Sequence, residues 1–297
     1  MKHQLKHPAP GKLVNVNGHD MHIFAEGQGD KKLVFMSGCG TSCPVLDFKP
    51  LWSLLTDRFK IVVIEKTGYG WSQVSKRPRD LDTMLADSRE ALRLAGIAAP
   101  YILVPHSLSG LEAIYWAQKY PQEVQAITGL DPSVPDIADA MKFSRLRKFM
   151  LRFMSRLARM KMSESDVIKV IEKNFPSPSF KSASLNDGDR AAFIELFQQR
   201  TFTADMRREI NDMPGNANMV RALPLPVNVP VYFFTSDFKD AEKQGHDPEK
   251  LIKFHRDFLA GFKTAKHLEM ACGHYVHAFE PDRIADEIRV FVDSCVW

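Results

Sequence analysis

Short runs of apolar residues alternate with longer stretches of helical periodicity along this chain. Near-continuous apolar runs, the pattern of strands buried on both faces of a sheet, lie at residues 33–38, 59–65, 101–104, 124–130 and 231–236. A further strand is expected at 266–271, and helical patterns occupy 45–55, 83–94, 111–118, 249–262 and 282–292. The alternation predicts βαβ units, and hence an α/β domain whose mostly parallel sheet carries helices on both faces.

The first strands follow a different pattern. Residues 12–17 and 21–26 alternate in polarity and are joined through Asn17, Gly18 and His19. Asn-Gly between two such segments is a strong signal for a tight hairpin. The sheet should therefore begin with an antiparallel pair.

Between residues 132 and 229 the strand pattern disappears. Helical patterns take its place, with Pro- and Ser-rich breaks between them, at residues 138–160, 164–174, 187–200, 204–212 and 216–222. We interpret residues 133–225 as an all-helical cap and residues 1–132 with 226–297 as the α/β core. Such a cap should lie over the carboxyl ends of the strands, where open α/β sheets place their sites.

Composition restricts the class of protein. The 297 residues are 44% hydrophobic and 26% charged, as in a soluble globular domain, and the net charge of +4 is too small to indicate nucleic-acid binding. No segment approaches the roughly 20 apolar residues that span a bilayer, and no signal peptide is evident. The four cysteines, without metal-binding spacing, are interpreted as reduced thiols: Cys39, Cys43, Cys272 and Cys295. We expect a soluble cytoplasmic protein without metal or organic cofactor and without stable membrane insertion; the oligomeric state stays open.

Ser107 lies in a turn between an expected strand and an expected helix, the context of a nucleophile elbow. The residues two before and two after the serine must pack closely in such a turn, and here they are Pro105 and Ser109. Ser109 is small, whereas Pro105 departs from the usual glycine. The alternative interpretation is an ordinary helix N-cap, formed by Ser107 or Ser109.

His274 follows the last expected strand and is preceded by Gly273. Imidazole takes up and returns a proton near neutral pH, so a histidine in this loop could serve Ser107 as general base. His277 is the rival three residues later. A structural loop histidine is the alternative for either residue.

A carboxylate is also needed, because it holds the imidazole in one tautomer. Asp131 ends the run 124–130 and precedes Pro132, so it should continue the strand and point from its tip. Asp237 and Asp240 follow the run 231–236. A turn aspartate and solvated loop charges are the alternative interpretations of these three residues.

Together these residues resemble the α/β-hydrolase superfamily, in particular its capped esterase, lipase and aminopeptidase-like members. The resemblance rests on Ser37-Gly38 after the first apolar run, the segment Gly68–Ser72 after the second, the Ser107 turn and Gly273-His274. It implies an α/β-hydrolase fold with a helical cap. It also implies an oxyanion hole made by the backbone N–H groups of Cys39 and Leu108.

The family usually places its acid after the strand that corresponds to residues 231–236, in a G-x-x-D pattern. Here that pattern is broken, because Ser236 is followed at the third position by Lys239. A minority of members use the preceding strand, and residues 127–135 look locally like the acid segment of pancreatic-type lipases. We therefore prefer Asp131, ahead of Asp240 and then Asp237. Epoxide-hydrolase and dehalogenase chemistry, which use an aspartate at the elbow, are disfavoured by Ser107.

Residues 142–161 predict an amphipathic helix with an apolar Phe, Leu and Met face and a basic opposite face. We interpret the basic face as solvated, with attraction of acidic substrates or anionic lipid as the alternative. The apolar side chains favour an ester with an apolar moiety. The expected activity is thus that of a carboxylesterase-like serine hydrolase acting on a small-molecule ester or amide. The alternatives are a proline-type aminopeptidase, with Glu195 or Asp205 as candidates to bind the amine, a ligand-binding receptor with little turnover, and a cyanohydrin lyase.

Overall fold

The computed structural model of the protein describes residues 5–141, 152–153, 163–173, 177–243 and 245–295. Its centre is one eight-stranded sheet with strand order β1-β2-β4-β3-β5-β6-β7-β8. Neighbouring strands from β4 to β8 run parallel, whereas β1–β2 and β2–β4 are antiparallel. The strands are β1 (Lys12–Val16), β2 (His19–Glu26), β3 (Lys32–Met36), β4 (Lys60–Glu65), β5 (Tyr101–Pro105), β6 (Val124–Leu130), β7 (Val231–Thr235) and β8 (Ala265–Glu269).

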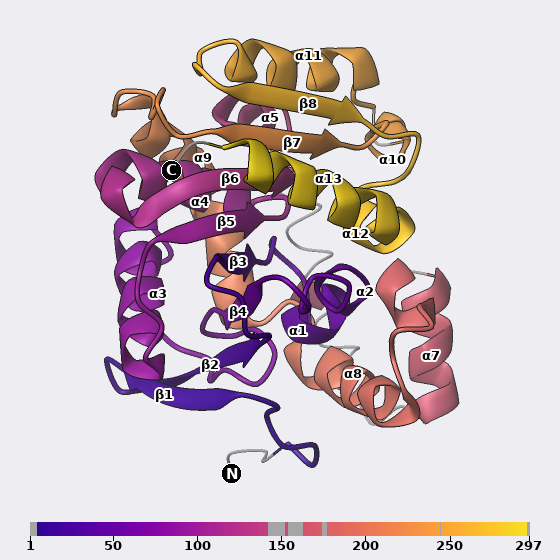
Figure 1. Cartoon of the computed structure of the whole chain (residues 1–297). Helices are drawn as coiled ribbons and strands as arrows, with labels where there is room; N and C mark the ends of the chain where they lie inside the picture. The colour runs from indigo at the N-terminus through magenta and orange to yellow at the C-terminus, as the bar shows by residue number, and fades with distance from the viewer. Residues whose placement is uncertain (1–4, 142–151, 154–162, 174–176, 244, 296–297) are drawn as a thin grey trace.

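Helices cover both faces of this sheet (Figure 1). One face carries α3 (Leu81–Ala95), α4 (Ser109–Lys119) and α11 (Pro248–Leu259), and the other carries α1 (Pro44–Asp47), α2 (Lys49–Trp52) and α13 (Pro281–Ser294). Short helical turns complete the core: η1 (Pro121–Glu123), α10 (Lys239–Glu242) and α12 (Val276–Phe279). The predicted α/β class, with a mostly parallel sheet between two helical layers, is confirmed.

The central strands bury both of their faces. In β3, Val34 and Met36 pack into the cluster under α3 and α4, while Leu33 and Phe35 pack into the cluster under α1, α2 and α13. Successive side chains of a strand point to opposite faces, so a strand covered on both sides must be apolar at every position. This requirement explains why the continuous apolar runs located the strands so closely.

The predicted hairpin is also present. Val16 pairs with His19, so β1 and β2 are joined by the two residues Asn17 and Gly18. Both have positive φ angles, 50° and 81°, as the turns of two-residue hairpins require. The Asn-Gly sequence therefore fixes the antiparallel edge of the sheet.

One helix predicted at residues 45–55 is wrong in detail, because two short helices, α1 and α2, occupy this region. Phe48 ends the first and begins the second. Pro50 has no N–H to bond the carbonyl four residues before it, which favours a break at this point.

The segment between β6 and β7 is helical in its described part. It contains α5 (Pro135–Ala140), α7 (Glu164–Lys173), η2 (Pro178–Lys181), α8 (Asp187–Arg200) and α9 (Ala204–Arg221). The helix expected from residue 138 instead begins at Pro135, and the basic helix expected at 142–161 lies, apart from residues 152–153, outside the described residues. The division into core and cap at residues 132 and 226 stays a prediction.

Helix α9 corrects a second prediction. We expected two helices, at 204–212 and 216–222, with a break at Pro214 and Gly215, but one helix of 18 residues runs through both. Met213, Ala217 and Val220 bury their side chains in the cluster that also contains α4. This packing outweighs the missing N–H of Pro214 and the low helix propensity of glycine.

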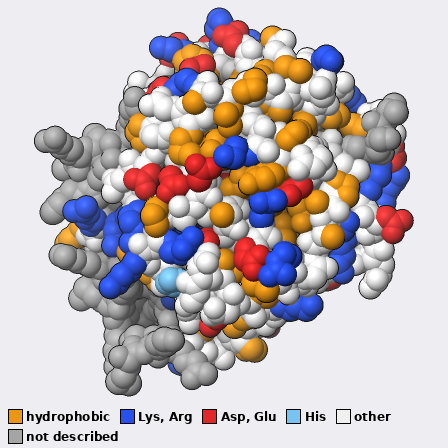
Figure 2. All heavy atoms as spheres, turned by 90° about the vertical axis from the view of Figure 1, so that its left-hand side faces the viewer, with side chains coloured by type: hydrophobic (Ala, Val, Ile, Leu, Met, Phe, Trp, Pro, Cys, Tyr) orange, Lys and Arg blue, Asp and Glu red, His pale blue; other side chains and the backbone are white. Residues whose placement is uncertain are grey.

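None of the described helices is long and apolar enough to cross a membrane. On the face shown in Figure 2, acidic and basic side chains are interspersed rather than gathered by sign. The small positive net charge therefore creates no single-sign surface on this face. All four cysteines are free, in keeping with their interpretation as thiols.

Candidate active site

Ser107 lies directly beyond the carboxyl end of β5, in a sharp turn that leads into α4. Its φ angle is +55°, a conformation that is uncommon for residues other than glycine. The turn is held by the Ser107 N–H, which donates to the Leu130 carbonyl (3.3 Å), and by the Ser107 carbonyl, which accepts from the amides of Gly110 (2.9 Å) and Ser133 (2.7 Å). Such a strained strand-to-helix turn lifts the serine above the edge of the sheet.

Close packing around this turn depends on the neighbouring strand. A Cβ atom added at Gly38 would lie 2.5 Å from the Ser107 Cβ and 2.9 Å from the His106 carbonyl. Glycine is thus required at the end of the β3 segment because the backbone of the elbow approaches so closely.

The alternative interpretation, a serine N-cap, does not hold for α4. The N-cap residue of this helix is Leu108, and no side chain caps it. Ser109 instead donates its hydroxyl to the carbonyls of Met36 (2.6 Å) and His106 (2.8 Å). The Ser109 side chain therefore ties the turn to β3, which agrees with the need for a small residue at this position.

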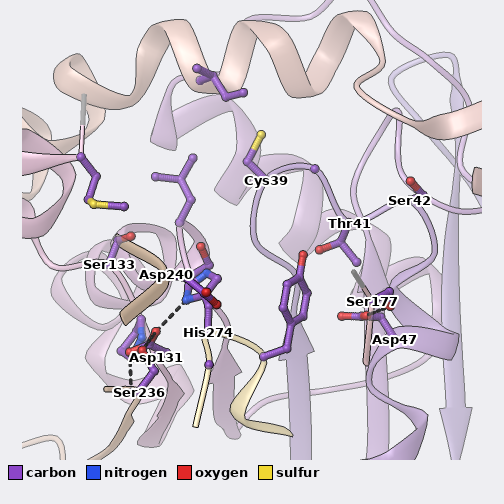
Figure 3. A pocket seen from close by; sticks show the side chains of 18 of the residues that line it. Cys39, Thr41, Ser42, Asp47, Asp131, Ser133, Ser177, Ser236, Asp240 and His274 are labelled. Atoms are coloured by element: carbon purple, nitrogen blue, oxygen red, sulfur yellow. Dashed lines mark hydrogen bonds and ion pairs between the residues drawn. The ribbon is translucent and has the colours of Figure 1, made fainter. Parts of the chain in front are cut away.

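His274 and Asp131 are brought together. The His274 Nδ1 lies 2.6 Å from the Asp131 Oδ2, and the dashed line in Figure 3 marks this contact. Asp131 is 3% exposed, whereas 38% of the His274 side chain is exposed. Because a carboxylate accepts the Nδ1 hydrogen, the Nε2 of a neutral His274 carries a lone pair.

Asp131 has further partners that keep it ionised. Its Oδ1 accepts from the Ser236 amide (3.0 Å) and its Oδ2 from the Ser236 hydroxyl (2.7 Å). Burial raises the pKa of Asp131, but the hydrogen bond and charge of His274, together with Ser236, outweigh burial and lower this pKa. A buried carboxylate with these donors remains charged near neutral pH.

His255 contacts the chain next to Asp131 and the end of β7. Its Nε2 lies 2.6 Å from the Pro132 carbonyl and its Nδ1 lies 2.8 Å from the Thr235 hydroxyl. Burial lowers the pKa of His255 to about 4, so this imidazole is neutral and its one N–H donates to the carbonyl. The residue that follows Asp131 is thereby fixed.

The three rival residues have other contacts. Asp237 pairs with Lys239 (2.9 Å), and Asp240 pairs with Lys243 (2.8 Å), although Asp240 also lines the cavity described below. His277 is fully buried with its Nε2 3.1 Å from the Asp47 Oδ2. Of the three aspartates, Asp131 is the one that contacts His274, and its role as the acid stays a prediction. Its φ angle of +47° corrects the expectation that it would extend the strand before Pro132.

The two amides expected to form an oxyanion hole both border the same cavity as Ser107. Cys39 follows β3 by way of Ser37 and Gly38, and Leu108 follows Ser107. Within the described part of the chain, neither the Cys39 nor the Leu108 amide donates a hydrogen bond to the protein. Both donors are thus available to a bound group.

Ser107, His274 and Asp131 open into one cavity of about 480 Å³. Apolar side chains form most of its wall, among them Leu108, Ile137, Phe202, Ile210, Met213 and Phe238. Across the described residues no group of three His, Cys, Asp or Glu side chains is arranged to hold a metal ion. The Ser107 hydroxyl makes no hydrogen bond to His274 in the described structure, and such bonds are often long before a substrate binds.

A second group of charged side chains lies beside Cys39, where α9 meets the core. The Glu209 carboxylate contacts the Lys66 Nζ (2.7 Å), the Arg79 Nη2 (2.7 Å) and the Tyr69 hydroxyl (2.9 Å), and Lys66 also contacts Glu112 (3.2 Å). Burial raises the pKa of Glu209, but Lys66 and Arg79 outweigh burial and lower it to about 2. This group was not expected from the sequence, because its members come from four separate segments.

The Cys39 thiol touches this group and is not activated by it. The Sγ lies 3.2 Å from the Met206 carbonyl of α9. Burial, with a further contribution from Glu209, raises the pKa of Cys39 well above its ordinary value. A thiol that stays protonated is a poor nucleophile, so this environment does not favour Cys39 as a thiol nucleophile.

The carboxylates considered for an aminopeptidase lie elsewhere. Glu195 accepts from the backbone of Lys6 and His7 near the N-terminus, and Asp205 accepts from Ser75 and pairs with Arg208. Neither residue lines the cavity. The structure therefore separates both from Ser107.

Three positioning residues were missed by the sequence analysis. Ser236 was noted only as a departure from the usual acid pattern, yet it binds Asp131 twice. His106 is 2% exposed, and its Nε2 lies 3.1 Å from the His274 carbonyl, while His255 holds Pro132. The position of His106 directly before Ser107 in the sequence was the one available signal.

Comparison with known proteins supports membership of the α/β-hydrolase superfamily. A family model described as the alpha/beta hydrolase fold matches residues 33–167. An uncharacterized protein of Bacillus subtilis, YbdG, is 33% identical over 274 residues, which cover 92% of this chain and 83% of that protein.

Solved structures share the fold at low identity. The enol-lactonase from Burkholderia xenovorans superposes with a TM-score of 0.66 and 15% identity, over 95% of this chain and all of that one. The haloalkane dehalogenase from Bradyrhizobium elkani superposes with a TM-score of 0.63 and 17% identity, over 95% and 97% of the two chains. With the sheet order, the strained serine turn and these relatives in agreement, the chain belongs to the α/β-hydrolase superfamily.

Proposed function

We propose that the protein is a serine hydrolase that cleaves a carboxylic ester with an apolar moiety through an acyl-enzyme. The observation that carries this proposal is the 2.6 Å contact between His274 and the buried Asp131, on the wall of the cavity that Ser107 enters. Ser107 is the nucleophile, His274 the general base, and Asp131 the residue that orients the imidazole. The aspartate required at the elbow for dehalogenase chemistry is replaced by Ser107.

In the first half of the reaction, the Ser107 Oγ attacks the ester carbonyl and passes its proton to the His274 Nε2. Asp131, already ionised, stabilises the imidazolium that forms. The oxyanion accepts hydrogen bonds from the Cys39 and Leu108 amides, each worth on the order of 3 kcal/mol in the transition state. The imidazolium then protonates the departing alcohol, which leaves an acyl group on Ser107.

In the second half, His274 takes a proton from water, and the hydroxide formed attacks the acyl carbonyl. The same amides hold the second oxyanion, and the proton returns to the Ser107 Oγ as the acid departs. The apolar wall of the cavity accommodates the hydrocarbon part of the substrate. No step in this sequence consumes an oxidant, a reductant or a second substrate other than water.

An amide substrate is the nearest alternative. A proline-type aminopeptidase needs a carboxylate for the free amine, and the two side chains considered for this role, Glu195 and Asp205, are outside the cavity. Matched esters and amides of the same acyl group would separate the two activities. We expect hydrolysis of the esters and little or none of the amides.

The test is covalent labelling by a fluorophosphonate probe, followed by mass mapping of the modified peptide. We expect stoichiometric labelling of Ser107 in the wild type, none in Ser107→Ala, and normal labelling in the control Ser165→Ala, whose serine is exposed on α7. Absence of labelling in folded wild-type protein would contradict the proposal. Saturable ligand binding without turnover would then favour a receptor built on a hydrolase fold.

A further inference from the structure

The cavity has two polar ends that differ in their partners. In Figure 3, His274, Asp131, Ser236 and Asp240 gather at one end, while Thr41, Ser42, Asp47 and Ser177 lie at the other. The first end contains the residues of the proposed reaction. The second end has no part in that reaction, yet it presents a buried carboxylate and several hydroxyl groups.

Asp47 is 2% exposed and keeps spare hydrogen-bonding capacity. Its Oδ1 accepts from the Ser177 hydroxyl (3.2 Å), and its Oδ2 faces the His277 Nε2 (3.1 Å). A carboxylate has about four acceptor sites, so two partners leave about half of them unused. Asp47 is also a residue of the cavity wall.

The His277 ring is placed to donate one hydrogen bond to Asp47. The His277 ring is fully buried, and its Nδ1 has no hydrogen-bond partner among the described residues. A second N–H on this ring would be a buried donor without an acceptor, which is costly, so the ring carries its one hydrogen on Nε2 and donates it to Asp47. Asp47 therefore keeps acceptor sites for a further donor.

Two hydroxyl groups beside Asp47 lack protein partners. Thr41 is 7% exposed, points into the open space at this end in Figure 3, and makes no hydrogen bond through its hydroxyl in the described structure. Tyr275 also lines the cavity, and its hydroxyl has no partner there either. Burial, aided by the charge of Asp47, raises the pKa of Tyr275, so its hydroxyl stays protonated and can donate.

Unpaired polar groups on buried residues such as Thr41 are uncommon in proteins, and those in a cavity wall are explained when a ligand completes them; Tyr275 is only partly buried. A hydroxyl group fits this set best. It donates to the Asp47 carboxylate and accepts from Thr41 or Tyr275, whereas a carboxylate would be repelled by Asp47 and an alkyl group would leave the Thr41 and Tyr275 hydroxyls unpaired.

Resting on the esterase activity proposed above, we propose that Thr41, Asp47 and Tyr275 form a polar subsite for a hydroxyl group of the substrate. The substrate class is then a hydroxylated ester. One part of it is apolar and lies along Ile137, Ile210 and Met213, and a hydroxyl in the acyl or the alcohol half reaches the Asp47 end.

The experiment measures kcat/KM for matched esters that differ in one terminal group: methyl, hydroxyl, ammonium or carboxylate. One series varies the acyl half and a second varies the alcohol half, at several chain lengths. In at least one series we expect the hydroxyl-terminated ester to be favoured over the methyl-terminated ester by about tenfold or more. Preference for the ammonium or the carboxylate ester, or no preference in either series, would overturn the subsite.

Three variants locate the effect. Thr41→Val and Tyr275→Phe each remove one hydroxyl with little change in shape, and Asp47→Asn removes the charge. Each should reduce the ratio of kcat/KM for the hydroxyl and methyl esters, by about three- to tenfold for the two hydroxyls and by more for Asp47. Thr56→Val, which removes a hydroxyl bonded to the Ser53 carbonyl away from the cavity, should leave the ratio as in the wild type.

Labelling and ester hydrolysis by the wild type distinguish failure of the subsite from failure of the proposed activity. Wild-type protein that labels at Ser107 and hydrolyses the esters without regard to the hydroxyl would contradict the subsite alone. Wild-type protein that neither labels nor hydrolyses any ester would contradict the proposed activity. A thermal midpoint close to that of the wild type confirms folding, and Thr41→Val and Tyr275→Phe keep the test usable should Asp47→Asn be unstable.

Discussion

The protein has two groups of buried charged residues, one around Glu209 and one around Asp131, and their hydrogen-bonding partners differ. Around Glu209, both carboxylate oxygens are used by Lys66, Arg79 and Tyr69, and the charged side chains are at most 5% exposed. Around Asp131, the carboxylate is equally buried, but its partner His274 is 38% exposed and has a ring nitrogen free for the cavity. The Glu209 group does not line the cavity and is called the closed group, whereas the Asp131 group reaches the cavity through His274 and is called the open group.

This difference separates two uses of buried charge. None of the residues around Glu209 lines the cavity, so the effect of this closed group is on the free energy of unfolding and on the contact between α9 and the core. An open group can exchange a proton with a bound molecule because one partner faces the cavity. The comparison predicts that substitutions in the two groups will affect different measurements.

The largest effect is expected from Asp131→Asn. The amide cannot hold the imidazole in the required tautomer or stabilise its charged form, so kcat for the preferred ester should fall by about 10⁴. The fold should persist, because Ser236 can still bond the side chain. Asp237→Asn is the matched control: its carboxylate, paired with Lys239, should be dispensable within about twofold. Equal losses in both variants would refute the assignment of Asp131.

The next effect is on stability. Glu209→Gln leaves the buried charges of Lys66 and Arg79 with less compensation, and we expect urea unfolding to show a loss of about 3 to 5 kcal/mol. Activity per folded molecule should fall much less than in Asp131→Asn. Asp212→Asn, at a partly exposed position on the same helix, should stay within about 0.5 kcal/mol of the wild type. A catalytic loss without destabilisation would break the comparison.

The stabilising effect of Glu209 should depend on pH. Its pKa in the folded protein is about 2, below the ordinary 4.5, so its contribution is present above about pH 4.5 and is lost as the pH falls toward 2. The contribution corresponds to about 3 kcal/mol. Unfolding of the wild type and Glu209→Gln should thus differ most near pH 6 and converge in acid. A difference that is constant with pH would exclude this origin.

The smallest effect concerns the geometry of the open group. In Gly38→Ala the new Cβ would meet Ser107 and His106, and we expect a loss of about 1 to 3 kcal/mol in stability and of roughly 100-fold in kcat. Gly215→Ala is the matched control, since nothing lies within 4 Å of its added Cβ inside α9. It should stabilise the protein by about 0.5 to 1 kcal/mol. If Gly38→Ala were as stable and as active as Gly215→Ala, close packing of Gly38 against the Ser107 turn would not be needed for stability or activity.

The fold was predictable because its strands are buried on both faces. Residues 59–65 and 124–130 are apolar at nearly every position, and this pattern requires little tertiary information. Helix α8 was predicted with its observed bounds. In the structure, Asn186 and Asp189 form a capping box that fixes where this helix begins. The break predicted at Pro214 was wrong because packing of α9 against α4 outweighs local propensity.

The site was predictable as a set of candidates, and the choice among them was not. Asp131, Asp237 and Asp240 all follow strands at the same edge of the sheet, so spacing alone cannot rank them. The proposal of Asp131 rests on its contact with His274, while lysines engage the other two aspartates. The Asp47 end of the cavity had no local signal, because Thr41, Asp47 and Tyr275 converge from different segments.

The position of Asp131 at the end of β6 also has a consequence for how this protein could diversify. The turn after β7, which includes α10, borders the cavity through Phe238, Asp240 and Ala241 but does not supply the partner of His274. Side chains of this turn can therefore be exchanged without touching the contact between His274 and Asp131. A laboratory library confined to residues 237–243 would explore new specificities at little risk to turnover, which makes this turn the natural starting point for directed evolution.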